Sequence, residues 1–194
     1  MPVAVIVDYE PSWPDHAERL LHEVEAALVP LAGSDRFRYE HIGSTAVPGL
    51  AAKPLIDLQV RMPYLPALDE LADLLASTGF VPAPGSRADS PGVHRDTPRP
   101  GDPTDTALYE KRLFHDPARA AILHVRRADS PFAHFVVLFR DWLRSNPEQA
   151  DVYQQVKRRL AAQHAGDGDA DDYTRSKTAF FDETDEAMRA WARA

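Results

Sequence analysis

Apolar residues recur at helical spacing in five stretches of the chain, and each stretch is predicted to form a helix with one buried face. The first helix begins at Ser12, which can cap it, and Pro14 fits its first turn. The last begins at Tyr173, after a segment rich in glycine and aspartate. The five predicted helices cover residues 12–31, 65–75, 130–143, 146–161 and 173–194.

Between these helices, apolar and polar residues alternate with a period of two, which is typical of β-strands. Two of the stretches flank a turn sequence at 116–119, which predicts an antiparallel hairpin. Phe80 and Val81 fit the start of a further strand, and Val3 to Val7 fit either a short strand or an arm docked on the protein. The alternating stretches are residues 37–42, 55–60, 106–114 and 121–126.

These elements predict an α+β fold, in which a mixed sheet packs with helices, rather than a doubly wound parallel sheet. We expect one domain over residues 1–194, with a sheet core in 1–128 and a helical C-terminal part in 129–194. The stretch 82–103 has almost no large apolar residue and is predicted to be either a mobile lid or a surface excursion. Its basic residues are suited to closing over a phosphate: Arg87, His94, Arg95 and Arg99.

The sharpest chemical signal is a loop of small residues followed by a carboxylate within an apolar strand. Gly43 permits a tight bend, and Ser44 can cap the short helical turn after it. Free N–H groups at such a junction favour an anion such as phosphate. Asp57 shares one face of its predicted strand with Leu55 and Gln59. Because an unpaired carboxylate is costly to bury, Asp57 requires a cation, a metal or an edge position.

Composition limits the class of ligand. The net charge of −8 argues against broad binding to DNA or RNA, which requires a basic face, but it is compatible with a local phosphate pocket. The chain has no cysteine, which excludes disulfides and thiolate zinc sites. No apolar run is long enough to span a membrane and no secretory leader is recognised, so we expect a cytoplasmic protein without a membrane partner.

The block from His41 to Leu58 reads HIGSTAVPGLAAKPLIDL and resembles the GrpB-like family, a branch of the nucleotidyltransferase superfamily. The resemblance implies a nucleotidyltransferase-like fold. Domains of this family also resemble segments fused to dephospho-coenzyme A kinases, which indicates a phosphorylated small molecule as the context. The similarity covers nearly the whole chain and continues in Trp13-Pro14, Leu123-His124-Val125, residues 139–147, Tyr153 with Lys157 and Tyr173 with Lys177.

The resemblance also implies a site for a nucleotide or another phosphorylated small molecule, with Mg²⁺ as cofactor. Nucleotidyltransferases hold two divalent metals with two carboxylates on one strand and a third nearby. Here Asp57 is the first ligand and Gln59 stands in the second position, so the affinity for Mg²⁺ should be low. Glu110 or His124 would complete the metal shell or act as the base. The implied phosphate-binding residues are Gly43, Ser44, Thr45, Lys53, Tyr173 and Lys177.

Two hypotheses of different class follow. The protein is either a nucleotidyltransferase with an unknown acceptor, or a non-catalytic module that binds a nucleotide, a phosphorylated metabolite or a partner protein. Gln59 favours the second hypothesis, whereas the Gly-Ser loop with Lys53 and Asp57 favours a retained ligand site in both. The structural alternatives are a solvated loop lysine at Lys53, a helix-surface pair at Tyr173 and Lys177, a core histidine at His124 and an exposed strand residue at Glu110.

Overall fold

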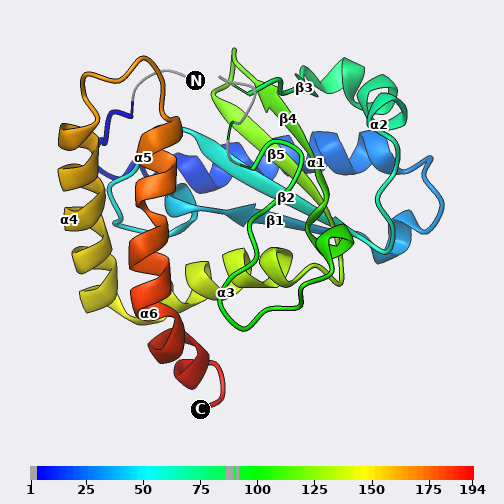
Figure 1. Cartoon of the computed structure of the whole chain (residues 1–194). Coiled ribbons are helices and arrows are strands. Elements are labelled where there is room, and N and C mark those ends of the chain that lie inside the picture. Colours follow the sequence, from blue (N-terminus) through cyan, green and yellow to red (C-terminus); the bar gives the residue numbers. More distant parts are fainter. Residues whose placement is uncertain (1–3, 86–89, 91) are drawn as a thin grey trace.

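The computed structural model describes residues 4–85, 90 and 92–194. Five strands form one mixed sheet in the order β1-β2-β5-β4-β3 (Figure 1). β2 runs antiparallel to β1 and parallel to β5, while β4 pairs antiparallel with both β5 and β3. The predicted α+β class, the mixed sheet and the β4–β5 hairpin are therefore confirmed. The strands are β1 (Arg38–Ile42), β2 (Ile56–Met62), β3 (Val81–Pro82), β4 (Lys111–Asp116) and β5 (Ala121–Arg127).

The helices begin close to the predicted capping residues. Pro14 lies in the first turn of α1, and the Ser130 hydroxyl at the start of α3 accepts a hydrogen bond from the Ala133 N–H. Among the described residues, no helix combines the length and the apolarity that crossing a bilayer would need. The helices are α1 (Trp13–Leu28), α2 (Leu68–Leu75), α3 (Pro131–Ser145), α4 (Pro147–Gln163), α5 (Asp171–Ser176) and α6 (Thr178–Trp191).

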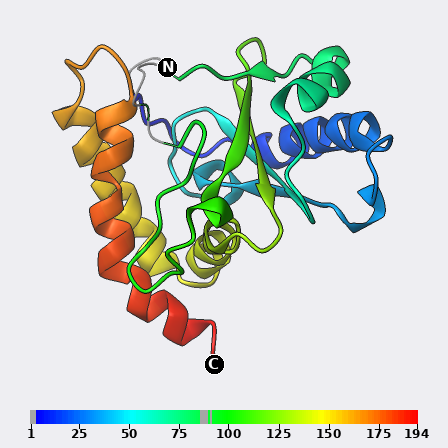
Figure 2. The same cartoon turned by 45° about the vertical axis from the view of Figure 1, so that its right-hand side comes forward.

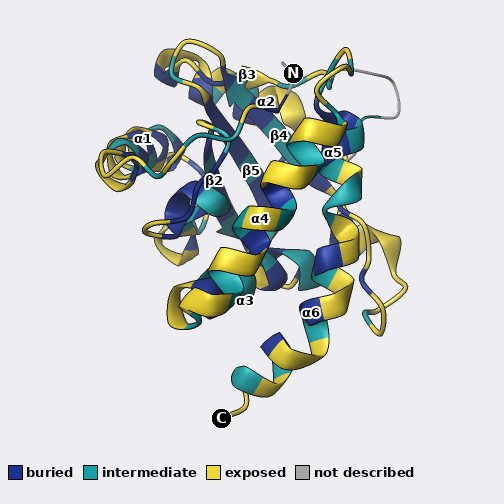
Figure 3. Cartoon of the chain, turned by 90° about the vertical axis from the view of Figure 1, so that its left-hand side faces the viewer, coloured by how far each residue is buried: buried dark blue, intermediate teal, exposed yellow. Residues whose placement is uncertain are grey.

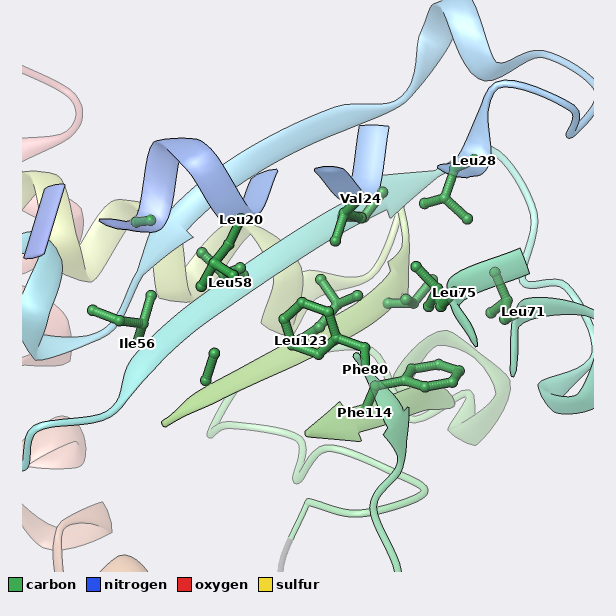
Figure 4. Close-up of a cluster of buried hydrophobic side chains, with 14 of the residues drawn as sticks. Leu20, Val24, Leu28, Ile56, Leu58, Leu71, Leu75, Phe80, Phe114 and Leu123 are labelled. Carbon is green, nitrogen blue, oxygen red and sulfur yellow. The ribbon is translucent and has the colours of Figure 1, made fainter. Parts of the chain in front are cut away.

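One face of the sheet is apolar and packs beneath α1 and α2 (Figure 4). The alternation predicted for β2 is confirmed here, because every second residue of that strand points into this core. Burial of this apolar surface is the main stabilising contribution to the α1–α2 side of the protein. The buried side chains include Leu20, Val24, Leu28, Ile56, Leu58, Leu71, Leu75, Phe80, Phe114 and Leu123.

The opposite face of the sheet is largely polar, since it carries Asp57, Gln59 and Arg61 of β2 beside His124 and Arg126 of β5. Helices α4, α5 and α6 stand across the molecule from α1 and α2 (Figure 2). α4 and α6 pack with α3 and with the loop after β1 around a second apolar cluster, and the outward surfaces of these helices are exposed (Figure 3). This cluster includes Val47, Leu50, Phe135, Trp142, Tyr153, Phe180 and Met188.

The predicted start of β4 is wrong, whereas the N-terminal stretch matches the second of its two predicted alternatives. Residues 106–109 form a 3₁₀ turn rather than a strand, because the Asp105 carboxylate accepts the Ala107 N–H and caps the turn. β4 therefore begins only at Lys111. In the described N-terminal residues a single bridge joins Val7 to Ala52, so this segment is a docked arm and not a strand.

The final predicted helix is divided in two. α5 begins at Asp171, before Tyr173, and the chain breaks helical continuity at Lys177. The Lys177 carbonyl accepts the N–H groups of both Phe180 and Phe181, which starts α6 as a separate helix. The break places the Lys177 side chain at a helix junction rather than in the middle of a helix.

The stretch 82–103 is tied to the rest of the protein by buried charges. Asp96 forms ion pairs with two strands of the sheet, and Arg99 pairs with Asp182 and Asp185 of α6. This part of the stretch is therefore neither a free lid nor a plain surface excursion. Of its other basic residues, His94 is exposed, Arg95 lies 4.0 Å from Glu110, and Arg87 lies outside the described residues.

Candidate functional site

Asp57 lies on the polar face of β2, beside the loop that follows β1. Its side chain is 31% exposed. Gly43 has a φ of +71° and a ψ of −170°, and a Cβ at this position would lie 2.6 Å from Oδ2 of Asp57. A side chain at position 43 would displace the carboxylate, so the Gly-Ser loop and Asp57 form one structural unit.

Two arginines of α3 donate hydrogen bonds to backbone carbonyls of this loop and of the strand before it. Nη1 of Arg140 donates to the His41 carbonyl at 2.9 Å, and Arg144 donates to the Ala46 carbonyl through Nε at 2.9 Å and Nη2 at 2.7 Å. Thr45 is buried, and its hydroxyl lies 3.0 Å from Nε2 of His41. Burial, with the charges of Arg144 and Arg140, lowers the pKa of His41 to about 4. The Thr45 hydroxyl thus forms a hydrogen bond within the loop and does not point towards a ligand.

His124 of β5 presents an N–H group to Asp57. Nζ of Lys111 lies 3.2 Å and Nη2 of Arg126 lies 3.3 Å from Nδ1 of His124. Because both groups are donors, Nδ1 accepts and the ring proton is on Nε2, which lies 3.7 Å from Oδ1 of Asp57. Burial and the two cations lower the pKa of His124 well below its usual range. The ring is therefore a neutral donor at pH 7.

Asp96 forms ion pairs with both Lys111 and Arg126, the two cations that lie next to Nδ1 of His124. Its Oδ1 accepts from Nζ of Lys111 at 2.8 Å and from Nη2 of Arg126 at 3.0 Å, and its Oδ2 accepts from Nε of Arg126 at 2.7 Å. All three side chains are at most 3% exposed. Burial opposes the charged form of Asp96, but the two cations hold its pKa below the usual range. Burial lowers the pKa of Lys111 to about 8.

Gln59 links three strands and α3 instead of facing a ligand. Its Oε1 accepts from Nη1 of Arg126 at 2.8 Å, and its Nε2 donates to Oε2 of Glu40 at 2.8 Å and to the Ala133 carbonyl at 3.1 Å. The side chain is fully buried. Its single oxygen is therefore already bound to a guanidinium.

Lys53 and Lys177 are two half-buried lysines beside Asp57. Within the described residues, neither Nζ donates a hydrogen bond or lies within 4.0 Å of a carboxylate. Burial raises the pKa of Asp57, and the charges of Lys177 and Lys53 are the strongest opposing influences. Burial lowers the pKa of both lysines; the negative charge of Asp57 opposes this for both, and that of Asp171 opposes it for Lys53. Two half-buried ammonium groups thus lie beside Asp57 without a hydrogen bond to a carboxylate among the described residues, an arrangement that favours an added anion.

Two lysines, one within α4 and one directly after α5, each lie over the ring of the tyrosine four residues earlier. Nζ of Lys157 lies 4.8 Å from the Tyr153 ring centroid, and Nζ of Lys177 lies 5.0 Å from that of Tyr173. Burial raises the pKa of Tyr173 to about 12. Burial also raises the pKa of Tyr153, which a hydrogen bond with Ser44 opposes. Both phenols are therefore protonated at neutral pH.

Lys157 should make stability depend on pH. It is buried and donates to the Ala51 carbonyl, and burial, with the charges of Lys177 and Arg158, lowers its pKa from 10.5 to about 6. Between these values the unfolded chain binds a proton that the folded protein does not, so the free energy of unfolding should rise with pH. In Lys157→Met this rise should be smaller. Urea unfolding at several pH values measures it, and equal slopes in the two proteins would contradict the assignment.

Glu110 is the predicted site residue that lies apart from Asp57. It precedes β4, bridges Arg95, and its side chain is 48% exposed. The β4 residue level with Asp57 is His115, at the opposite end of that strand. The other predicted residues lie on the polar face or in the segments beside it: Gly43, Ser44, Thr45, Lys53, Gln59, His124, Tyr173 and Lys177. The set of Gly43, Ser44, Lys53, Asp57, His124 and Lys177 is called the Asp57 site below.

A Mg²⁺ ion held by the protein alone does not fit this donor set. In the described part of the chain, no three His, Cys, Asp or Glu side chains are grouped to hold a metal. Asp57 is a single carboxylate among ammonium groups, and the oxygen of Gln59 is bound to Arg126. Hard divalent cations require several oxygen ligands. Asp57 and Gln59 therefore do not provide the coordination that a two-metal mechanism uses.

Sequence reasoning missed Asp96 and Lys111. Asp96 lies in an irregular stretch without a motif, so no local pattern indicates that it is buried against the sheet. Lys111 falls within a predicted strand, where a charged residue is normally solvated. The available signal is the scarcity of lysine, since the chain has four lysines against eighteen arginines.

Fold and site together define an α+β protein in which Asp57, on the polar face of a mixed sheet, lies beside a Gly-Ser loop and two half-buried lysines from outside the sheet. The chain belongs to the GrpB family, because the sequence model of that family, described as GrpB protein, matches residues 3–187. A crystal structure of the conserved protein GrpB from Enterococcus faecalis is similar, with a TM-score of 0.70 and 26% identity, and the match covers 96% of this chain and 99% of that one.

Curated relatives fall into two groups by name. A UPF0157 protein of Halalkalibacterium halodurans is 34% identical over 156 residues, which cover 80% of this chain and 68% of that protein. Proteins named dephospho-CoA kinase in Mycolicibacterium paratuberculosis and Mycobacterium tuberculosis are 35% and 36% identical, covering 96% and 97% of this chain. The chain spans 46% of each of these kinases, about half their length.

Proposed function

We propose that this protein binds a nucleotide or another phosphorylated small molecule at the Asp57 site. The observation that supports the proposal is the pair Lys53 and Lys177, two half-buried ammonium groups without a hydrogen-bond partner among the described residues. A lysine binds phosphate as a point charge, and a phosphate between these groups would compensate for their removal from water.

Asp57 and His124 suggest what lies next to the phosphate. The carboxylate accepts and Nε2–H of His124 donates, and the two groups lie 3.7 Å apart. An acceptor beside a donor suits the hydroxyl groups of a ribose or another polyol, whereas Asp57 would repel a second phosphate. We therefore expect a ligand in which a phosphate adjoins a hydroxyl-bearing part.

The names of the relatives are consistent with this class of ligand. Several are named dephospho-CoA kinase, a name that refers to a nucleotide-related small molecule. That name belongs to chains about twice as long as this one, so it supports the class of ligand and not kinase activity here.

Nucleotidyl transfer on a nucleotidyltransferase-like fold is the second candidate, and the position of Asp57 favours it. The carboxylate lies between the Gly-Ser loop and His124, where it is placed to accept a proton from an acceptor hydroxyl. The buried link between Gln59 and Arg126 favours binding alone, because it leaves a single carboxylate facing the site.

Isothermal titration with ATP, GTP, CTP, UTP and inorganic phosphate, with and without Mg²⁺, tests the proposal. We expect binding without added metal, and Lys53→Ala and Lys177→Ala should each weaken it by about tenfold or more, since each removes a charge-assisted hydrogen bond. Arg19→Ala is the matched control, because it removes one positive charge from an exposed position on α1. Its affinity should equal that of the native protein.

The Asp57→Asn variant separates the two candidates. Phosphate binding that survives this change, without any pyrophosphate release by the native protein, supports a binding module. Binding that requires both Mg²⁺ and Asp57, with pyrophosphate release, supports nucleotidyl transfer. Failure of every nucleotide and of phosphate to bind would contradict both candidates.

A further inference from the structure

Basic residues are divided unevenly over this molecule. The chain contains eighteen arginines and only four lysines, and three of the four lysines lie close enough to Asp57 for their charges to act on it. The charges of Lys53, Lys111 and Lys177 act directly on Asp57, and Lys157 is close enough for the charge of Lys177 to act on it. Elsewhere in the described structure the ion pairs are formed by arginine, as in Arg119 with Asp116, apart from His164 with Asp167.

Phosphate binding alone does not explain this distribution. Arginine binds phosphate through two parallel hydrogen bonds and is the more frequent choice where geometry matters. Lysine differs in one chemical property that arginine lacks, because an ammonium group can lose its proton near neutral pH when it is buried. The resulting amine is a nucleophile. The use of lysine at this one place indicates chemistry that requires an amine.

Lys177 is the best placed of the four lysines. Lys111 is bound to Asp96 and Lys157 to the Ala51 carbonyl, whereas Nζ of Lys177 has no acceptor among the described residues. Burial lowers its pKa, the charge of Lys53 adds to this, and only Asp57 opposes it. The raised pKa of Asp57 suits a group that takes up and returns protons during a reaction.

We propose that Nζ of Lys177 forms an imine with a phosphorylated aldehyde or ketone, a step that rests on the phosphate site proposed above. Lys53 holds the phosphate, and the neutral amine attacks the carbonyl carbon. A C–N bond forms while the carbonyl π pair moves to oxygen. Asp57 passes the two amine protons from nitrogen to that oxygen, the C–O bond breaks and water leaves, which gives the C=N bond. The step needs no oxidant or reductant.

Pyridoxal 5′-phosphate is a suitable probe because it joins an aldehyde to a phosphate. The full chain is mixed with the probe, treated with borohydride to reduce any C=N bond to a stable amine, and mapped by mass spectrometry. We expect labelling at Lys177, competition by inorganic phosphate, and weaker labelling by pyridoxal, which lacks the phosphate. Labelling should fall at least about tenfold in Lys177→Arg, because a guanidinium does not lose its proton.

Two controls separate this inference from the phosphate site itself. Titration of the native protein with inorganic phosphate measures the phosphate site separately from the labelling. Arg19→Ala, which removes a positive charge from an exposed position on α1, should be labelled at Lys177 to the same extent as the native protein. If phosphate binds but the probe labels only other amines, the imine proposal is overturned and the phosphate site stands. If phosphate does not bind, both are overturned.

Discussion

Asp96→Ala is expected to lower the free energy of unfolding by about 3–5 kcal/mol, because it leaves two buried cations without a counter-ion. Lys111 and Arg126 each donate to Asp96, and no other carboxylate lies within 4.0 Å of them among the described residues. The same change removes the support behind His124, so ligand binding at the Asp57 site should weaken as well.

Urea unfolding monitored by circular dichroism measures the loss. Asp73→Ala is the matched control, since Asp73 is exposed on α2, and its effect should stay within about 0.5 kcal/mol. The contribution of Asp96 should also depend on pH. Its pKa is held below that of the unfolded chain, so its stabilisation is present above about pH 4 and is lost as the pH falls through the folded-state pKa. Equal losses in the Asp96 and Asp73 variants would refute the buried network.

Gly43→Ala should cost about 1–3 kcal/mol of stability and abolish binding at the Asp57 site. Two effects add: position 43 has a φ of +71° with an extended ψ, which is nearly exclusive to glycine, and the new Cβ would lie 2.6 Å from Oδ2 of Asp57. The carboxylate must therefore move away from its position beside the loop.

Gly49→Ala provides the matched comparison for this variant. Gly49 also has a positive φ, of +79°, but a Cβ there would meet no atom within 4 Å. Both variants should show backbone strain in urea unfolding, but only Gly43→Ala should lose ligand binding in titration calorimetry. If Gly43→Ala binds phosphate and nucleotides as the native protein does, the loop and Asp57 do not act as one unit.

Local patterns in the sequence account for most of the fold. Alternation in residues 55–60 assigns Ile56 and Leu58 to the core and Asp57 to the opposite face, because side chains in a strand alternate between the two faces. The Gly-Ser loop could be identified for a similar reason, since glycine and small residues mark a tight approach of backbone to side chain.

The buried residues that position the Asp57 site could not be predicted, because their contacts join segments far apart in the sequence. Asp96 comes from an irregular stretch and meets Arg126 of β5, and Gln59 meets Glu40 of β1. Each residue alone resembles an ordinary solvated side chain. Gln59 shows the consequence: its position suggested a weakened metal ligand, whereas its oxygen is held by a guanidinium.

The Asp57 site draws two ammonium groups, neither with a hydrogen-bond partner among the described residues, from parts of the chain more than a hundred residues apart. Lys53 and Asp57 lie before the β4–β5 hairpin, whereas Lys177 follows α5 and reaches the site only when the C-terminal helices have docked on Val47 and Leu50. A nascent chain that has emerged only as far as β5 has the loop and the carboxylate but not the second lysine. If the proposed function holds, both lysines are available only after the C-terminal helices have docked, and a ligand that bridges them would favour the docked arrangement over partly assembled chains.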